Sequence, residues 1–334
     1  MMHDACYMML NTYHVPVLLE EIIQLLAPKP GDNAIDCTLG GGGHSLALLK
    51  RISPKGKLLA IDADPAAIQE ASLRLAGEGV LGQAILVNDN FVNINEIVNK
   101  TSFKPVQVIL LDLGLSSYQL DTAKRGFSFW GEEPLNMQFS GGGGGTTAWE
   151  VVNNYPKQKL KEILAVNADI GKPGDIAHRI VRSRGEQSIK TTSMLVEAIL
   201  GAPLSEGSGA DQFSRNLPPL QRKLLTKVFQ AIRIEVNREL QNLRQVLPQL
   251  LEILSVNGRL AVISYHSGED RIVKHFFRAA AKSCICPKES PICRCTNQAK
   301  IRILTKKAIK PQVKEISANS RARSAILRVI EKLS

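Results

Sequence analysis

Four consecutive glycines stand where a short apolar segment gives way to a helical one. The sequence reads Asp-Cys-Thr-Leu-Gly-Gly-Gly-Gly-His over residues 36–44. Glycines at such a junction let backbone N–H groups approach a ligand closely. A dinucleotide fingerprint is excluded, because counting from Gly40 or Gly41 puts Ser45 or Leu46 where its third glycine belongs. The Gly-Lys-Ser/Thr of a phosphate-binding loop is also missing, so the alternatives are another ligand loop or a plain tight turn.

Three further side chains stand at the ends of apolar segments. Asp62 is placed to accept hydrogen bonds from the ribose hydroxyls of an adenosine-containing cofactor. Its alternative role is to cap the next helix, which Asp64 before Pro65 can do instead. Phe91 can stack on an adenine ring or fill the core. Asp112 ends the next apolar segment.

Alternating strands and helices are predicted to position these residues. We expect the strands at 33–38, 57–62, 83–88 and 106–111, with a helix after each of the first three. That order indicates an α/β fold with a doubly wound parallel sheet. Because the carboxyl ends of parallel strands meet at one edge, the candidate residues should lie there together.

The alternation then stops, and a helical insertion is predicted. A long helix at 223–254, kinked by Pro248, should lead into a fifth strand at 258–265 and two last strands at 300–305 and 324–330. The predicted domains are residues 1–117 and 223–334 for the core and 118–222 for the insertion.

Two other features have open interpretations. His266 follows the fifth strand and could transfer protons or make a structural hydrogen bond between loops. Cys284, Cys286, Cys293 and Cys295 form C-x-C-x6-C-x-C, which could hold a tetrahedral Zn²⁺ or be reduced thiols in a surface loop.

The charge is positive and uneven. Lys and Arg number 42 against 31 Asp and Glu, a net +11. Residues 300–334 hold ten of the basic residues and two acids. Such a stretch suits a polyanion such as nucleic acid, the alternative being a merely solvated basic surface. No apolar run approaches the ~20 residues of a membrane span, and no secretory signal stands at the N-terminus, so a cytoplasmic location is expected.

A nucleoside-binding edge without a phosphate-type glycine fingerprint favours S-adenosylmethionine as the cofactor. At this point the chain resembles the bacterial small-subunit ribosomal RNA cytosine-N4 methyltransferases, the MraW-like family. The resemblance extends over nearly the whole chain and rests on residues 14–20, 36–45, 62–65, 111–121, 125–129, 229–240, 263–274 and 319–325.

The resemblance implies a class I S-adenosylmethionine-dependent methyltransferase sheet with an inserted, RNA-facing helical domain. It also implies that small-subunit ribosomal RNA or the assembled subunit is the partner, at one cytidine of the decoding region, with neither membrane nor DNA involved. The cofactor-binding residues implied are Gly42, Gly43, His44, Asp62, Phe91, Asp112 and Gln119.

The chain departs from the usual family pattern in three places. It has Glu-Glu-Pro-Leu-Asn-Met-Gln at 132–138 where the family usually has Asp-Gly-Pro-Leu-Asp-Met-Arg. It has Ala-Asp-Ile-Gly-Lys-Pro-Gly at 168–174 in place of a Gly-Glu-Glu stretch, and His-Ser-Gly-Glu-Asp at 266–270 where the family has His-Ser-Leu-Glu-Asp.

The expected chemistry is in-line attack by an exocyclic amine on a sulfonium methyl group, which needs alignment and acceptors for the amine hydrogens. The candidate catalytic residues are Asp112, Ser116 in the turn at 113–117, and His266. Methylation at carbon 5 would need a cysteine nucleophile, and no cysteine stands in 112–121 or 264–270. The alternatives are another amine methyltransferase, acting on nucleic acid or protein, and a non-catalytic RNA-binding assembly factor.

Overall fold

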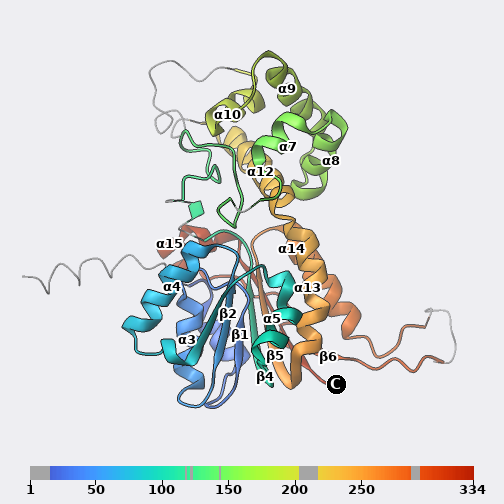
Figure 1. The fold of residues 1–334 in the computed structure, drawn as a ribbon. Helices are drawn as coiled ribbons and strands as arrows, with labels where there is room; N and C mark the ends of the chain where they lie inside the picture. The colour runs from blue at the N-terminus through green and yellow to red at the C-terminus, as the bar shows by residue number, and fades with distance from the viewer. Residues whose placement is uncertain (1–15, 117–118, 121–122, 143, 203–216, 287–293) are drawn as a thin grey trace, which may run out of the picture. The chain divides into compact units, whose positions relative to one another are not determined.

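The computed structural model describes residues 16–334 except 117–118, 121–122, 143, 203–216 and 287–293 (Figure 1). The chain forms two compact units. Met1–Gly114 and Asn242–Ser334 make the first unit, and Leu115–Gln241 make the second. The return to the first unit therefore comes later than the predicted residue 223.

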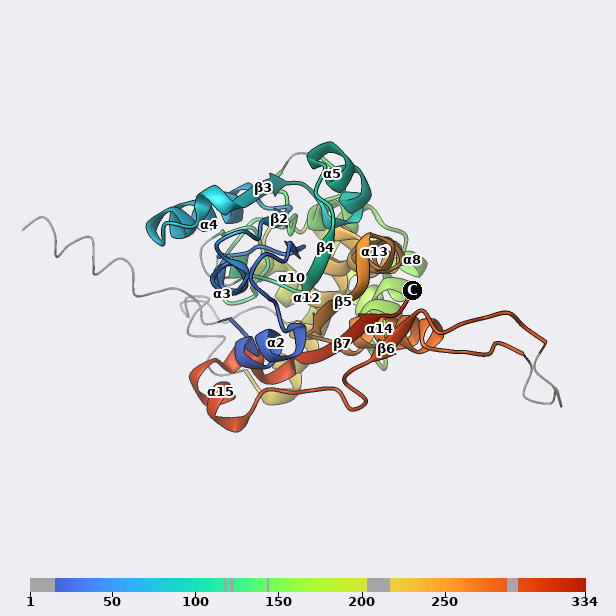
Figure 2. The same cartoon turned by 90° about the horizontal axis from the view of Figure 1, so that it is seen from below.

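The first unit contains a seven-stranded sheet in the order β3-β2-β1-β4-β5-β7-β6 (Figure 2). The first five strands in that order are parallel, and β7 is antiparallel to both β5 and β6. The predicted doubly wound α/β sheet is confirmed. The strands are β1 Ala34–Asp36, β2 Leu58–Asp62, β3 Ala84–Asn88, β4 Val106–Asp112, β5 Leu254–Ser264, β6 Ile301–Ile303 and β7 Ile326–Lys332.

Helices cover both faces of this sheet. Strand residues alternate between the two faces, so that Ile35 joins one hydrophobic cluster and Ala34 the other. The cluster with Ile35 contains residues of α5 (Ile94–Thr101), α13 (Glu239–Ile253) and α14 (Ser267–Ala280). The other contains residues of α2 (Leu19–Leu26), α3 (Gly43–Ile52) and α4 (Pro65–Gly77). The remaining short elements of this unit are α15 Val313–Ala318 and the 3-10 turns η2 Leu81–Gln83, η3 Phe91–Asn93 and η4 Ser320–Ser324.

The second unit is helical, with a hydrophobic core of its own. Its helices are α7 Ala148–Asn154, α8 Lys157–Ala168, α9 Pro173–Glu186, α10 Thr192–Leu200 and α12 Pro219–Asn237. Leu225, Val228 and Phe229 of α12 are buried in this core. The predicted boundary at 222 is therefore too early, because it assigns this helix to the first unit.

The predicted single helix at 223–254 with a kink at Pro248 is wrong. The chain breaks at Arg238, which adopts a left-handed conformation with φ 51° and donates its N–H to carbonyls of the preceding turn. α13 begins at Glu239 and continues through Pro248. The apolar spacing runs across the break without interruption, so the hydrophobic pattern gave no sign of it.

Among the residues described, no helix is both long and apolar enough to cross a membrane.

Candidate functional site

The glycine loop connects β1 to α3 and is shaped by close backbone packing. Gly42 stands at the helix N-cap with φ +72°, a conformation that favours glycine. A Cβ on Gly43 would lie 2.4 Å from Cγ of Pro16, so no larger residue fits there without a shift of the chain. The shape of the loop therefore depends on two of its glycines, Gly42 for its backbone conformation and Gly43 for the lack of space around it.

Asp62, the last residue of β2, holds this loop in place. One carboxylate oxygen accepts the N–H of Gly40 at 2.8 Å, and the other accepts the N–H of Asp64 at 2.9 Å. Asp64 is the N-cap of α4, with its side chain accepting from the Ala66 N–H, as the sequence predicts. Each oxygen of Asp62 keeps acceptor capacity beyond its one backbone bond. Asp62 can therefore still receive hydroxyl donors from a ligand.

Asp112, the last residue of β4, is surrounded by contacts from three other segments. Its Oδ1 accepts the phenol hydroxyl of Tyr265 at 3.0 Å, and its Oδ2 lies 3.5 Å from Nδ1 of His44. The other ring nitrogen of His44 lies 3.0 Å from the carbonyl oxygen of Val17. The backbone N–H of Asp112 donates to the Thr38 hydroxyl. These contacts fix the carboxylate at the carboxyl ends of β1 and β4, where the strand order reverses and open α/β sheets bind ligands.

Burial sets the acidity of the carboxylates along this edge. It raises the pKa of Asp112 to about 8, because desolvation and the nearby Asp36 and Glu269 outweigh the hydrogen bond from Tyr265. It raises the pKa of Asp62 to about 6 and also raises that of Asp36, which accepts the Ser45 hydroxyl at 2.7 Å. An edge with such carboxylates favours a ligand that brings hydrogen-bond donors or positive charge.

His266 makes structural hydrogen bonds at the start of α14, and a role for it in proton transfer stays a prediction. It is the N-cap of α14, and its Nδ1 accepts the N–H of Gly268 at 3.2 Å. The buried Glu269 accepts the backbone N–H groups of Tyr265 and His266, which completes a capping box. Nε2 of His266 lies 3.3 Å from Oε1 of Glu269. The imidazole therefore organises the start of the helix and, through Glu269, the backbone of Tyr265.

The remaining predicted residues are less constrained by these contacts. Phe91 begins η3 after β3 and is partly buried against the hydrophobic cluster of α5, α13 and α14. Its stacking on adenine stays a prediction. Ser116 and Gln119 belong to the second unit, where the N–H of Ser116 donates to the Gln119 side chain. Their roles toward a ligand also stay predictions.

The sequence reasoning missed Tyr265, Glu269 and Thr38. Tyr265 directly follows β5, the strand paired beside β4, so its place next to the Asp112 end of β4 could have been inferred. Glu269 stands three residues after His266, which is the spacing of a capping box. Nothing in the local pattern marked Thr38, whose hydroxyl meets a residue 74 positions away.

The basic C-terminal stretch divides into structural and exposed cations. Arg328 forms a double hydrogen bond with Asp270, Arg302 pairs with Glu331, and Lys332 donates to the carbonyl oxygen of Leu254. Lys306, Lys307 and Lys310 are exposed.

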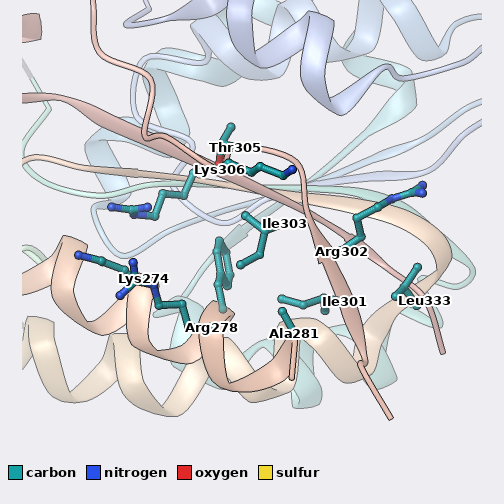
Figure 3. A pocket seen from close by; sticks show the side chains of 11 residues that line it. Lys274, Arg278, Ala281, Ile301, Arg302, Ile303, Thr305, Lys306 and Leu333 are labelled. Carbon is teal, nitrogen blue, oxygen red and sulfur yellow. The ribbon is translucent and has the colours of Figure 1, made fainter. Parts of the chain in front are cut away.

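A pocket of about 580 Å³ lies where this stretch meets α14 (Figure 3). Lys274 and Arg278 line it from α14, and Lys306 lines it from the segment after β6. Its apolar lining includes Ile301 and Ile303. The pocket presents several cations at one place, as binding of an anionic group requires.

The sequence of this chain matches known proteins along almost its whole length. The model of the MraW methylase family matches residues 11–333. A ribosomal RNA small subunit methyltransferase H of Dehalococcoides mccartyi is 44% identical over 328 residues, which cover 97% of this chain and 88% of the relative. The protein of the same name from Syntrophotalea carbinolica is 42% identical, with 96% of this chain and 98% of the relative covered.

Among solved structures, a putative rRNA methylase from Clostridium thermocellum aligns with 96% of this chain and 100% of its own, at a TM-score of 0.42 and 14% identity. That score is too low to support an inference about function. The sequence match is decisive, because it spans both core segments, the insertion between them and the C-terminal strands. The chain belongs to the MraW methylase family.

Proposed function

We propose that the protein transfers a methyl group from S-adenosylmethionine to the N4 amine of one cytidine in the decoding region of small-subunit ribosomal RNA. The observation that carries this proposal is the match of the family model to residues 11–333. Relatives that cover nearly the whole chain are named ribosomal RNA small subunit methyltransferase H. We propose small-subunit ribosomal RNA, free or in the assembled subunit, as the partner in the cytoplasm, and not DNA.

The residues at the carboxyl edge of the sheet fit the cofactor. The loop at Gly42 and Gly43 admits no side chains without a shift, so its backbone can lie close to a ligand. Asp62 retains acceptor capacity for the two ribose hydroxyls, and Phe91 stands at the end of the neighbouring strand for the adenine. When bound, S-adenosylmethionine supplies an electrophilic methyl group beside a positive sulfonium. The desolvated carboxylates of this edge would offset that charge in their ionised form.

Asp112 is our candidate for the group that accepts the N4 hydrogens. A cytosine amine is a weak nucleophile whose nitrogen becomes positive as it attacks, so an ionised carboxylate beside it lowers the barrier. Tyr265 donates to Oδ1 of Asp112, which favours the ionised form and fixes the orientation of the carboxylate. The target base must leave its stack to reach such a site. Ser116 remains a second acceptor candidate.

Cys37 supports attack by the amine over methylation at carbon 5. This cysteine follows β1 and is almost completely buried. Burial raises its pKa well above the ordinary value, which disfavours the thiolate that addition to carbon 6 would require.

Two surfaces support an RNA substrate. In the first unit, the pocket of Figure 3 and the exposed Lys307 and Lys310 provide cations for phosphates. In the second unit, Trp130 and Trp149 remain more than a third exposed, and the Arg222 guanidinium lies 5.5 Å from the centroid of the Trp130 ring. Exposed aromatic rings beside cations suit the stacking of unpaired bases.

Methyl transfer from labelled S-adenosylmethionine tests the proposal. Free small-subunit RNA, small subunits, whole ribosomes and duplex DNA should be incubated in parallel, and the products identified as nucleosides by mass spectrometry. We expect N4-methylcytidine, with the highest yield on small subunits. Formation of 5-methylcytidine, or activity lost in Cys37→Ser while cofactor binding persists, would overturn the mechanism. Cofactor binding without transfer to any substrate would favour an assembly factor.

RNA affinity should depend on the exposed lysines. Neutralising Lys306, Lys307 and Lys310 together should weaken binding and flatten its dependence on salt, by roughly 0.7 in log–log slope for each phosphate of single-stranded RNA that the variant no longer neutralises. Neutralising the exposed Lys55, Lys57 and Lys100 provides a control with the same change in charge. If the two triple variants bind alike, the basic stretch is only a solvated surface.

A further inference from the structure

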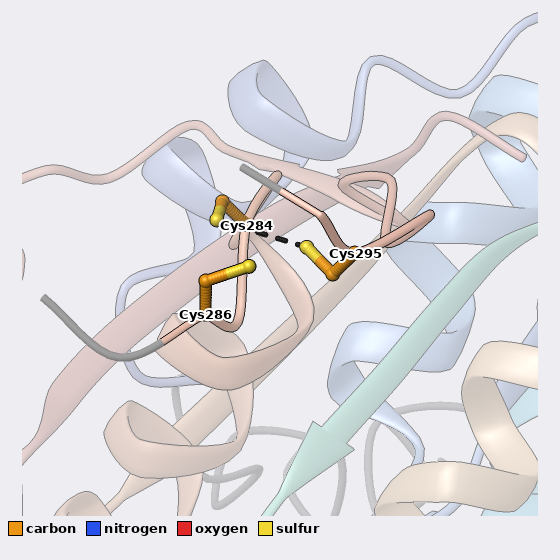
Figure 4. Close-up of side chains that lie close together, drawn as sticks. All are labelled: Cys284, Cys286 and Cys295. Carbon is orange, nitrogen blue, oxygen red and sulfur yellow. Dashed lines mark hydrogen bonds between the residues drawn. The ribbon is translucent and has the colours of Figure 1, made fainter. Parts of the chain in front are cut away.

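Three cysteine thiols lie close together on the long segment that joins α14 to β6, which we call the excursion (Figure 4). The sulfurs of Cys284, Cys286 and Cys295 all lie within 4.8 Å of one another. The first two stand on the arm that leaves α14, and the third stands on the arm that returns to β6. Cys293, the fourth member of the predicted quartet, lies outside the described residues.

The spacing of these sulfurs fits a shared metal ion. Sγ of Cys284 and Sγ of Cys295 are 3.7 Å apart. Zn–S bonds of about 2.3 Å in a tetrahedron place two sulfurs about 3.8 Å apart, whereas a disulfide bond is about 2.05 Å long.

Backbone donors orient the sulfurs from the opposite arm. The N–H of Ile285 donates to Sγ of Cys295, and the N–H of Arg294 donates to Sγ of Cys286, each at 3.4 Å. The two bonds run in opposite directions across the excursion. Such N–H donors direct ligand atoms toward a common centre.

Hydrogen bonds also join the two arms of the excursion at its base, next to α14 and β6. Its base is closed by the N–H of Lys300 on the carbonyl of Ala280 and by the Asn297 side chain on the carbonyl of Lys282. Beyond that base, its described residues form neither helix nor strand, and Ile285 is 65% exposed. A small segment without a hydrophobic core needs a cross-link to keep one conformation.

We propose that Cys284, Cys286 and Cys295 bind a structural Zn²⁺ that joins the two arms of this excursion. Soft thiolates select zinc over the hard cations that bind oxygen, and three of them account for three of the four positions of a tetrahedral site. Binding releases the thiol protons and couples the fold of the excursion to the metal. The proposed role is structural and independent of methyl transfer.

The test uses the full chain kept reduced with a phosphine. We expect elemental analysis to find one zinc per chain, and Co²⁺ added to the metal-free protein to give a thiolate-to-cobalt charge-transfer band. Cys284→Ser and Cys295→Ser should each reduce the affinity for zinc. The reduction should exceed the roughly 10- to 100-fold that is typical when a residue hydrogen-bonded to a metal ligand is lost. Cys37→Ala, which removes a buried thiol elsewhere, should keep the full stoichiometry.

Limited trypsin digestion provides a second readout that does not involve activity. Chelation should expose Lys282, Arg294 and Lys300 to cleavage while the sheet of the first unit stays protected. The proposal fails if reduced protein binds neither zinc nor cobalt through sulfur. It also fails if both serine variants keep their metal, or if mass analysis of the untreated chain shows a disulfide among these cysteines in place of a metal.

Discussion

Polar side chains are withdrawn from solvent both at the carboxyl edge of the sheet and in the turn at residues 136–146. Their hydrogen-bonding groups are paired differently in the two regions. At the edge, Asp36, Asp62 and Asp112 are carboxylates whose pKa values are raised by burial. In the turn, Asn136 and Gln138 are neutral amides that bond to one another, at 2.9 Å from the Gln138 N–H and 3.3 Å from the Asn136 amide.

The Gln138 amide also donates to the carbonyl oxygens of Gly144, Gly145 and Thr146. The turn is therefore closed and needs no further partner, as expected for a structural element. The edge keeps acceptors whose ionised form burial disfavours, as expected for a site that a ligand completes. The resemblance noted in the sequence implies an acid at 136 and an arginine at 138, where this chain has the uncharged Asn136 and Gln138.

Removing the charge of Asp112 should have the largest effect. Asp112→Asn keeps an acceptor for Tyr265 and presents an amide donor toward His44, so it copies the protonated acid and should fold. We expect kcat to fall by roughly 10²- to 10⁴-fold, the usual contribution of a positioned proton acceptor. Single-turnover methyl transfer with saturating cofactor measures it.

Tyr265→Phe tests the role of Asp112 through its hydrogen-bond partner. Loss of the phenol hydroxyl removes the bond that favours ionised Asp112, so the rise of rate with pH should move to higher pH while the alkaline rate is largely kept. If Asp112→Asn stays within twofold of the parent, Asp112 is not the acceptor.

Asp62→Ala should weaken S-adenosylmethionine binding by about 1–3 kcal/mol, because the ribose hydroxyls lose their acceptor. It should also lower stability, because Gly40 and Asp64 lose the partner of their N–H groups. Calorimetric titration and urea unfolding measure the two effects separately.

Asp32→Ala is the matched control for Asp62→Ala. Asp32 accepts the N–H of Lys29 in the turn before β1, at the opposite end of that strand, and its loss should leave cofactor affinity unchanged. Unaltered affinity in folded Asp62→Ala would remove Asp62 from the cofactor site.

The stability of the ligand-free protein should decrease from pH 6 to pH 9. Aspartates of the unfolded chain have a pKa of about 4, whereas burial in the folded state raises the pKa of Asp62 to about 6 and that of Asp112 to about 8. The folded state therefore binds more protons in this range, and the stabilisation is lost as pH rises through the folded pKa values.

In Asp112→Asn that decrease should be smaller, since one of the titrating groups is gone. Urea unfolding at each pH measures both proteins. Equal slopes for the parent and the variant would contradict the assignment of a raised pKa to Asp112.

In the closed turn the expected effect is on stability alone. Asn136→Asp turns an amide donor into a second acceptor facing Oε1 of Gln138, which should cost about 1–3 kcal/mol of unfolding free energy. Adding Gln138→Arg should recover part of this loss by restoring a charged pair, with a coupling energy of about 0.5–3 kcal/mol.

Asn154→Asp, at an exposed position of the same unit, should change stability by less than about 0.5 kcal/mol. Additive single effects in the double variant would show that 136 and 138 are not coupled, and that the turn is not the closed element described above.

Local residue patterns were enough to predict the sheet, the edge formed by its strand ends and the family. Strand ends can be predicted because alternation and apolar runs are local, and parallel strands must end at one edge. Asp62 and Asp112 were found in this way, and Asp64 was correctly given the helix cap. The separation of the insertion from the core also followed from the change of pattern, although its far boundary did not.

The partners of each side chain at the edge come from distant parts of the chain and follow from the fold. Tyr265 meets Asp112 across 153 positions of sequence, and the Thr38 hydroxyl receives the N–H of Asp112 across 74. Contacts with distant segments also give Arg302, Arg328 and Lys332 their hydrogen-bond or ion-pair partners. Lys306, from the same basic stretch, lines the pocket beside α14. The break at Arg238 was hidden because hydrophobic spacing reports burial and not backbone conformation. Hydrogen bonds and ion pairs between distant segments have no local signature, so they emerge only once the chain has folded.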